Sequence, residues 1–291
     1  MAEQARRIEL ADNAKRGASE EAIQAHYDVG NEFYRLWLDD SMSYSAGMWE
    51  RDSDSLGVAQ TRKRLHHIES AQASGKNSVL DIGCGWGACL EDLVTKHGVR
   101  TAVGLTLSSA QASWIKTHRD ERIVVLQEGW EDYEPVEAFD AIISIGAFEH
   151  FVKPDYDREE RTAIYRRFFA KCSRLLKPGG RMSLQTQAYN IGQYTPHSPL
   201  SQIFPESDMP RLPDVVAAFD GFFEPSVIRN DPSDYSRTVR AWLNNLQSNR
   251  EQAIAEAGET VFSNFERFLA GGVKGYENSV FMLLRLTLKR L

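Results

Sequence analysis

Three glycines at every second position, Gly83, Gly85 and Gly87, follow a short apolar run that contains Asp81. A helical pattern begins directly after them, which is typical of a strand, a tight turn and a helix that together hold a ligand. Glycine permits positive φ angles and leaves no Cβ between the backbone and that ligand. The amides at the start of the next helix would face it. The turn therefore predicts a cofactor site at the end of this strand.

The spacing of this turn narrows the class of ligand. The sequence has neither the Gly-x-Gly-x-x-Gly of dinucleotide-binding folds nor a following Gly-Lys-Ser/Thr. A pyrophosphate or a triphosphate is therefore disfavoured, which leaves S-adenosylmethionine as the natural ligand. A plain turn between a strand and a helix is the alternative interpretation of these residues taken alone.

A second chemical feature is Glu149, which follows another apolar run at residues 139–145. Open α/β sheets bind ligands at the carboxyl ends of their strands, so we expect this side chain near the glycine turn. Apolar neighbours such as Phe148 and Phe151 would raise the pKa of its carboxyl toward the range useful for proton transfer. His150 is a further catalytic candidate, and a supporting role is the favoured interpretation for it.

The hydrophobic pattern predicts the elements that would position these residues. Strands are predicted at residues 78–82, 100–106, 122–127, 139–145, 180–187 and 279–289, and helices at 56–71, 87–96, 109–119, 158–176, 235–257 and 259–270. Strands that alternate with helices imply an α/β fold with a parallel, doubly wound sheet.

The chain divides into four predicted parts. Residues 1–75 form an N-terminal helical lid, in which Ser19 caps a helix, and residues 76–188 form the cofactor-binding α/β core. Residues 189–231 hold six of the ten prolines and are too long for a simple loop, so we expect a substrate-covering insertion there. Residues 232–291 return to the same core with two helices and a closing strand.

Composition excludes several classes of protein. The net charge of −7 argues against a nucleic-acid partner and against a polybasic membrane anchor. No apolar run approaches the roughly 18 residues of a membrane span, and the first residues lack the apolar stretch of a signal peptide. Three cysteines form neither a disulfide framework nor a CxxC pair, so no metal site is expected. These features predict a cytoplasmic enzyme.

Six ordered segments carry a family resemblance. They are His26–Tyr34, Met42–Ser45, the glycine turn, Gly104–Ser108, Glu128–Glu131 and Ser144–Phe151. In order and spacing they resemble the cyclopropane-fatty-acid synthase and mycolic acid methyltransferase family, and the resemblance extends to the C-terminal strand. It implies a Rossmann-like class I methyltransferase sheet and S-adenosylmethionine as the cofactor. It does not identify the substrate, because one fold hosts many chemistries.

Several residues are expected to hold the methionine and ribose parts of this cofactor. Asp81 would order the glycine turn and the amino end of the methionine moiety, together with Gly83 and Gly85. The family binds the ribose hydroxyls with the Thr and Gln of its Gly-Leu-Thr-Leu-Ser-x-x-Gln motif. Those residues are Thr106 and Gln111 in this chain.

The resemblance also implies residues around the adenine and in the lid. Trp130 and Glu131 occur where the family brackets the adenine, with an aromatic face and an acceptor for its amino group. Tyr44 and Ser45, together with Tyr27, would close over the methionine end from the lid.

The chain departs from the family at three places. Cyclopropane synthases have a cysteine, a histidine and a second histidine where this sequence has Ala46, Gln185 and Asp234. The cysteine and the first histidine, with a glutamate and a tyrosine that correspond to Glu149 and Tyr235, resemble the set that holds a bicarbonate base in those enzymes. We therefore do not expect a complete bicarbonate site here.

These departures favour methyl transfer, with carbon as the acceptor atom, to an apolar small molecule of natural-product type. Ring closure is less favoured because it needs a base that removes a proton from the transferred methyl group. Three alternatives stay open: a cyclopropane or branched-chain fatty acyl synthase, a small-molecule N-methyltransferase, and a cofactor-binding protein without catalysis. A homo-oligomer is compatible with the sequence.

Overall fold

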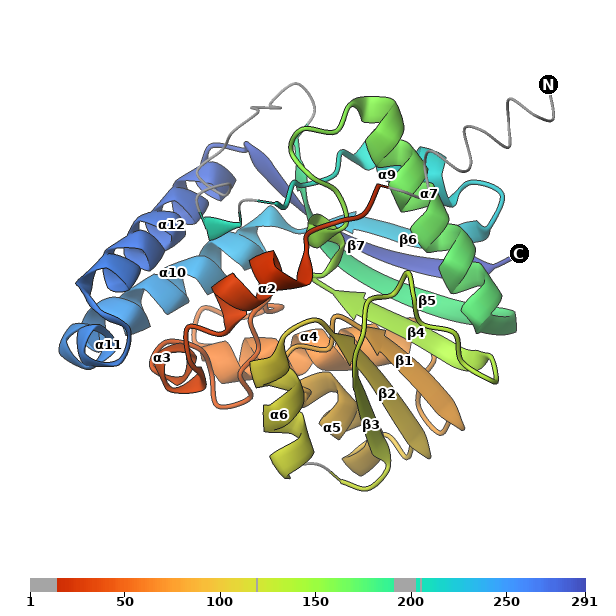
Figure 1. The fold of residues 1–291 in the computed structure, drawn as a ribbon, viewed down its shortest axis with the longest axis horizontal. Coiled ribbons are helices and arrows are strands. Elements are labelled where there is room, and N and C mark those ends of the chain that lie inside the picture. The colour runs from red at the N-terminus through yellow and green to blue at the C-terminus, as the bar shows by residue number, and fades with distance from the viewer. Residues whose placement is uncertain (1–14, 119, 191–202, 205) are drawn as a thin grey trace.

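A seven-stranded sheet forms the centre of the computed structural model, which describes residues 15–118, 120–190, 203–204 and 206–291 (Figure 1). The strands are β1 (Ser78–Ile82), β2 (Thr101–Thr106), β3 (Ile123–Gln127), β4 (Phe139–Ile145), β5 (Leu176–Tyr189), β6 (Phe223–Asn230) and β7 (Phe281–Arg290). Their order in the sheet is β3-β2-β1-β4-β5-β7-β6. Neighbours among β1 to β5 are parallel, and β7 is antiparallel to both β5 and β6. The predicted α/β sheet is confirmed.

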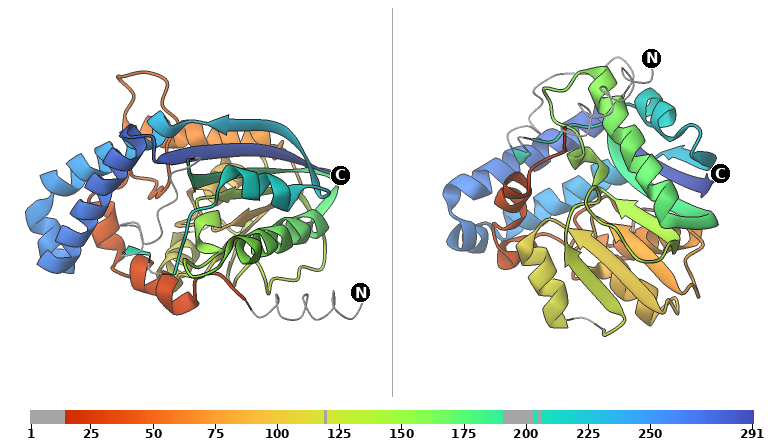
Figure 2. Two further views of the ribbon diagram at one scale, coloured as in Figure 1. Left: turned by 90° about the horizontal axis from the view of Figure 1, so that it is seen from above. Right: turned by 45° about the vertical axis from the view of Figure 1, so that its right-hand side comes forward.

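Helices cover both faces of this sheet. They are α2 (Glu20–Tyr27), α3 (Asn31–Arg35), α4 (Leu56–Ser70), α5 (Ala88–Thr95), α6 (Ser109–His118), α7 (Arg158–Leu175), α9 (Leu212–Phe219), α10 (Pro232–Ser248), α11 (Arg250–Ala257) and α12 (Glu259–Glu277), with a short 3₁₀ turn η1 (Phe148–His150). Helices α4 and α7 lie on opposite faces, as Figure 2 shows. Their apolar sides pack against the strands and form two separate hydrophobic cores.

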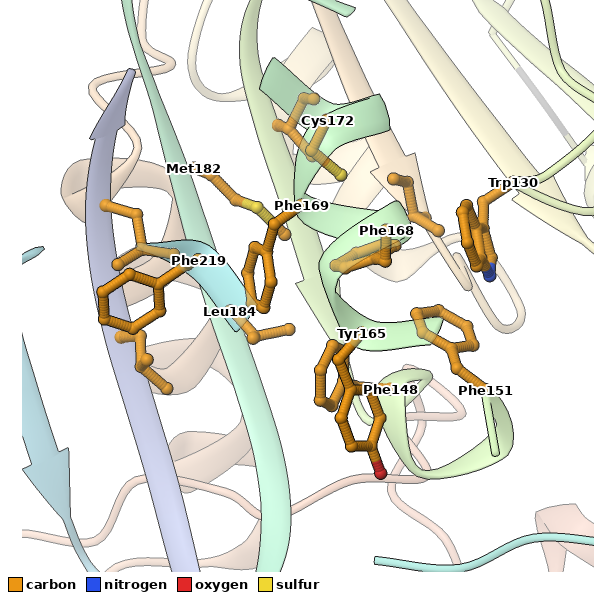
Figure 3. Close-up of a cluster of buried hydrophobic side chains, with 14 of the residues drawn as sticks. Trp130, Phe148, Phe151, Tyr165, Phe168, Phe169, Cys172, Met182, Leu184 and Phe219 are labelled. Atoms are coloured by element: carbon orange, nitrogen blue, oxygen red, sulfur yellow. The ribbon is translucent and has the colours of Figure 1, made fainter. Parts of the chain in front are cut away.

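An aromatic cluster between the sheet and α7 fixes the turn that carries Glu149 (Figure 3). The ring of Phe148 stacks on Tyr165 of α7, with centroids 4.4 Å apart and planes 18° apart. Phe151, at the other end of η1, packs against Phe168. Such aromatic pairs anchor both ends of the turn. Glu149 is consequently held in one place by packing on either side of it.

A third group of helices, in addition to those on the two faces, lies at one end of the sheet. Figure 1 shows α10, α11 and α12 together there, beside α2 and α3. Large aromatic side chains from the lid and from these helices, including Trp37, Trp242 and Phe265, form their own core. The lid and the C-terminal helices therefore pack as one layer against the edge at which the glycine turn lies.

The structure corrects the expectations for the second half of the chain. The 189–231 stretch contains α9 and β6, and of its prolines Pro196, Pro199 and Pro205 lie outside the described residues. Strand β6 was missed because it is an exposed edge strand with a proline, so it shows no apolar alternation. Strand β5 also begins at Leu176, four residues before the predicted start.

The predicted helix 235–257 is two helices, α10 and α11, separated at Asn249. This residue has φ −106° and ψ 26°, and its side-chain amide donates to the carbonyl of Leu36 over 2.8 Å. The turn there follows from this local conformation, which apolar spacing does not reveal. Within the described ranges, no helix combines the length and the apolar character of a membrane span.

Candidate active site

A cavity lies where β1, β2 and β4 end, directly over the glycine turn. Its wall includes Tyr27, Tyr44, Ser45, Asp81, Gly83, Gly85, Thr106, Gln111 and Trp130. Its empty volume, which includes open solvent at the mouth, is about 990 Å³, so the cavity has room for a cofactor-sized ligand. The structure therefore brings together all of the predicted cofactor residues except Glu131.

The backbone of the glycine turn explains why glycine is needed. Gly83 and Gly85 have φ angles of 81° and 55°, in the left-handed region that favours glycine. A Cβ at position 83 would overlap the side chain of Ala147, whereas a Cβ at position 85 would meet no atom within 4 Å. Gly83 therefore serves the packing of the turn, and Gly85 keeps a space open for a ligand.

Charged groups lie buried at the lid end of the cavity. Asp81 is 2% exposed, its Oδ1 has no hydrogen-bond partner within the described part of the chain, and burial raises its pKa to about 7. Lys63, which sequence reasoning missed, donates from Nζ to Ser45 Oγ over 2.8 Å. Apolar spacing in the predicted helix gave no sign that a lysine would be buried on this wall.

The predicted ribose residues form a pair of their own. Thr106 Oγ1 donates to Gln111 Oε1 over 2.7 Å, and both side chains are buried. The backbone amide of Ser108 donates to the same Thr106 hydroxyl, which fixes its position. The pair therefore presents a fixed hydroxyl and amide at the end of β2.

Glu131 lies away from the cavity wall. Its carboxylate forms ion pairs with Arg167 at 3.3 Å and Arg16 at 3.9 Å. Glu128 and Trp130, from the same sequence segment, line the cavity instead. The adenine-contacting role expected for Glu131 has no support in this arrangement.

A second cavity adjoins the first and is mainly aromatic and aliphatic. Its wall includes Glu149, Gln187, Phe204, Tyr235, Val239, Trp242, Leu269 and Tyr276. Four residues line both cavities: Tyr27, Tyr44, Gly146 and His150. A molecule in the second cavity would therefore meet a cofactor in the first at this shared wall.

Glu149 is one of two acidic residues on the wall of the second cavity, and the other, Asp208, is ion-paired with Arg161 and accepts a hydrogen bond from Tyr189. Glu149 Oε1 accepts a hydrogen bond from the backbone amide of Gln187 over 2.7 Å, while Oε2 is buried with no partner among the described residues. Burial raises the pKa of this carboxyl to about 7. Tyr276, which the sequence did not single out, donates to Gln187 Oε1 over 2.8 Å. Burial also raises the pKa of Tyr235, so its hydroxyl stays protonated.

His150 bridges the lid and the segment before α9. Its Nδ1 lies 2.7 Å from Ser207 Oγ, and its Nε2 lies 3.4 Å from the hydroxyl of Tyr27. Burial lowers the pKa of the ring to about 4, so it is neutral near pH 7. Its place on both cavity walls makes it a positioning candidate for either ligand.

The family model described as Mycolic acid cyclopropane synthetase matches residues 14–286. The chain belongs to this family. Cyclopropane mycolic acid synthase 2 of Mycobacterium bovis is 34% identical over 271 residues, which cover 86% of this chain and 88% of that protein. Cyclopropane mycolic acid synthase 3 of Mycobacterium tuberculosis is 33% identical over 291 residues, which cover 92% and 96%.

Solved structures agree with this family membership. The cyclopropane synthase MmaA2 from Mycobacterium tuberculosis has a TM-score of 0.84 at 29% identity, over 94% of this chain and 99% of that chain. The mycolic acid cyclopropane synthase CmaA1, complexed with SAH and CTAB, has a TM-score of 0.83 at 31% identity, with the same coverage. The fold is that of class I methyltransferases, and this family member is an S-adenosylmethionine-dependent enzyme of the methyltransferase type. Asp81 Oδ1, which has no hydrogen-bond partner among the described residues, and the open space over Gly85 fit that cofactor.

The three departures from the cyclopropane synthases are connected in the structure. Arg285 of β7 donates from Nε to Gln185 Oε1 over 2.9 Å and from a terminal nitrogen to Asp234 Oδ2 over 2.7 Å. Gln185 in turn donates to the carbonyl of Ala46 over 3.2 Å. The three positions at which we expect a cysteine and two histidines in cyclopropane synthases are therefore joined by one network, and Gln185 is not among the residues that line the two cavities.

Proposed function

We propose that this enzyme adds the methyl carbon of S-adenosylmethionine to a carbon–carbon double bond of an apolar chain and closes a cyclopropane ring. The observation that carries the proposal is Glu149, which lines the second cavity and whose buried Oε2 has no hydrogen-bond partner in the part of the chain that the structure describes. The relatives are named cyclopropane synthases, and one solved relative holds the lipid-like CTAB. These likenesses favour ring closure over the open-chain methylation that Ala46 and Gln185 led us to expect.

The two cavities would hold the two reactants in contact. When bound, S-adenosylmethionine supplies an electrophilic methyl group on a positively charged sulfur. Asp81, Thr106 and Gln111 would hold the cofactor, with the methyl group directed at the shared wall. The aromatic and aliphatic side chains of the second cavity would align the double bond and exclude water.

Glu149 would act as the general base. Ring closure requires that a proton leave the added carbon, and a base with a pKa near the working pH is the most effective. The amide of Gln187 fixes one oxygen of the carboxylate, so the other oxygen is left to accept the proton. Because Arg285 and Ala46 hold Gln185, we assign this step to Glu149 without a second side-chain base.

A labelled methyl donor tests the proposal. The enzyme is incubated with S-adenosylmethionine that has a trideuterated methyl group and with a phospholipid that has cis-monounsaturated acyl chains. The masses of the products are then measured by mass spectrometry. Ring closure leaves two deuterons in each product, and open-chain methylation leaves three. A product with three deuterons would refute ring closure and support the open-chain alternative. The rate is expected to be the same with and without added bicarbonate.

A further inference from the structure

Lys63 is a buried cation on the wall of the cofactor cavity. It lies on α4, its side chain is 3% exposed, and its Nζ donates to Ser45 Oγ. Within the described ranges it forms no ion pair with a carboxylate. A buried ammonium whose hydrogen-bond partner is neutral is unfavourable, because it has lost its hydration, and Asp39 and Asp81 favour its charge only from beyond ion-pair distance.

Arg64, the next residue in the sequence, differs from Lys63 because its charge has a direct partner. Arg64 also lines the cavity, but its Nε donates to Asp92 Oδ2 over 2.6 Å and a terminal nitrogen donates to Ser41 Oγ over 2.8 Å. The charge of Arg64 is thus compensated inside the protein. Lys63 has no such direct carboxylate partner among the described residues, so an anionic group that enters the cavity could contact it directly.

A buried group of the opposite sign lies on the same wall. Asp81 is as deeply buried as Lys63, and its Oδ1 has no partner among the described residues. No ion pair joins the two side chains within the part of the chain that the structure describes. The methionine end of the cofactor carries one carboxylate and one ammonium, so it matches both groups in charge.

We infer that Lys63 binds the carboxylate of the cofactor's methionine moiety, while Asp81 binds its ammonium. The two residues then form a site for an α-amino acid zwitterion at the lid end of the cavity. Burial lowers the pKa of Lys63 to about 7, and an arriving carboxylate would raise that pKa and hold the side chain charged. The inference concerns only the cofactor and holds whether or not the reaction closes a ring.

Three ligands with a decreasing number of charged groups test this site by calorimetry. They are S-adenosylhomocysteine, its decarboxylated form, which keeps the amine, and 5′-methylthioadenosine, which lacks both groups. Charge-assisted hydrogen bonds of the usual strength predict that the unaltered enzyme binds S-adenosylhomocysteine about 10- to 100-fold more tightly than the decarboxylated form. Equal affinity for these two ligands would overturn the proposal without any variant.

Two substitutions then locate the effect. Lys63→Met should weaken binding of S-adenosylhomocysteine about 10- to 100-fold and leave binding of the decarboxylated form within about twofold. Lys63→Gln, which can still donate to Ser45, should give the same pattern, and it replaces Lys63→Met if that variant does not fold. Equal weakening of both ligands would show that Lys63 acts only through Ser45 and would refute carboxylate binding.

Two further variants serve as controls. Asp81→Asn should weaken binding of both amine-containing ligands but not of 5′-methylthioadenosine. Lys171→Met removes an equally buried lysine on α7, which is paired with Glu134 and does not line the cavity. It should leave the affinity for S-adenosylhomocysteine unchanged, which shows that loss of a buried lysine is not enough to disturb the site.

Discussion

Arg285 and Gln185 are directly opposite each other on the antiparallel strands β7 and β5, and Arg285 Nε donates to Gln185 Oε1 over 2.9 Å. The same guanidinium, 1% exposed, donates to Asp234 at the start of α10 and to the carbonyl of Gly47 in the lid. One side chain thus ties the sheet to the lid and to the helix that carries Tyr235. It positions two walls of the second cavity without lining that cavity.

Replacing this arginine should destabilise the fold strongly. Arg285→Met leaves Asp231 and Asp234 without the cation that both contact at 2.7 Å. Removing one partner of a buried ion pair costs about 3–5 kcal/mol in the free energy of unfolding. Urea denaturation measures the change. Arg229→Met is the control, because Arg229 also pairs with Asp231 but is largely exposed, and it should cost less than about 1 kcal/mol. Equal losses in both variants would contradict the role given to the network.

Turnover should depend on the ionisation of Glu149. Only the ionised carboxylate accepts a proton, and burial raises its pKa to about 7, so the rate should rise with pH up to about 7 and then level off. His150 has a pKa of about 4, so its titration does not affect the pH dependence of kcat above pH 5. The measurement is kcat from pH 5.5 to 8.5 at saturating cofactor, which keeps the titration of Asp81 and Lys63 out of the profile. A flat profile would argue against Glu149 as the base.

Removing the carboxylate of Glu149 should slow turnover strongly and leave cofactor binding unchanged. General acid–base assistance contributes about 10² to 10⁴-fold, so Glu149→Gln should lower kcat by that factor. Its affinity for S-adenosylhomocysteine should not change, because Glu149 lines only the second cavity. A loss of less than about tenfold would give Glu149 a structural role instead.

A side chain at Gly85 should block the cofactor. The position has a φ of 55° and faces open cavity, so valine would add both backbone strain and a steric obstacle. Gly98→Val is the matched control, because Gly98 has a φ of 64°, is exposed and lies outside the cavity. Both variants should lose similar stability, but only Gly85→Val should lose binding of S-adenosylhomocysteine by calorimetry. Retained binding would remove Gly85 from the cofactor site.

Truncation of the Phe204 side chain should weaken binding of the acceptor without changing binding of the cofactor. Its ring lines only the second cavity and packs on His150, with centroids 5.1 Å apart. Phe204→Ala should therefore raise KM for the apolar acceptor several-fold and leave the affinity for S-adenosylhomocysteine unchanged. Phe222→Ala, outside both cavities, should change neither value. Weaker cofactor binding in Phe204→Ala would place this residue against the first cavity.

The sequence predicted the parallel strands, and most of the residues that it selected for the cofactor line the first cavity, because both have local signals. Apolar runs mark β1 and β4, and a spaced glycine motif marks the turn after β1. Glu131 was placed from its motif, yet its carboxylate pairs with Arg167, more than 30 residues away in the chain. The side-chain direction of one residue in a turn depends on such distant partners.

Lys63 and Arg285 could not have been found by the same reasoning. A lysine in a helix and an arginine in a strand are usually exposed, and hydrophobic spacing does not distinguish a buried charge from a solvated one. Their burial depends on Ser45 and on Asp231 and Asp234, which reach them only through tertiary structure. The network around Arg285 connects Gln185 and Asp234 directly and reaches the backbone carbonyl of Ala46 through Gln185, which inspection of each position alone did not reveal.

The wall that the two cavities share has a thermodynamic consequence. Tyr27, Tyr44 and His150 contact the space on both sides, so any shift that a cofactor causes in them also changes the free energy of binding an acceptor. Linkage is reciprocal: an acceptor must alter cofactor affinity by the same factor. The rate at which S-adenosylhomocysteine dissociates then depends on whether the second cavity still holds the product. The order of product release is thereby coupled to the conformations of the side chains on the shared wall.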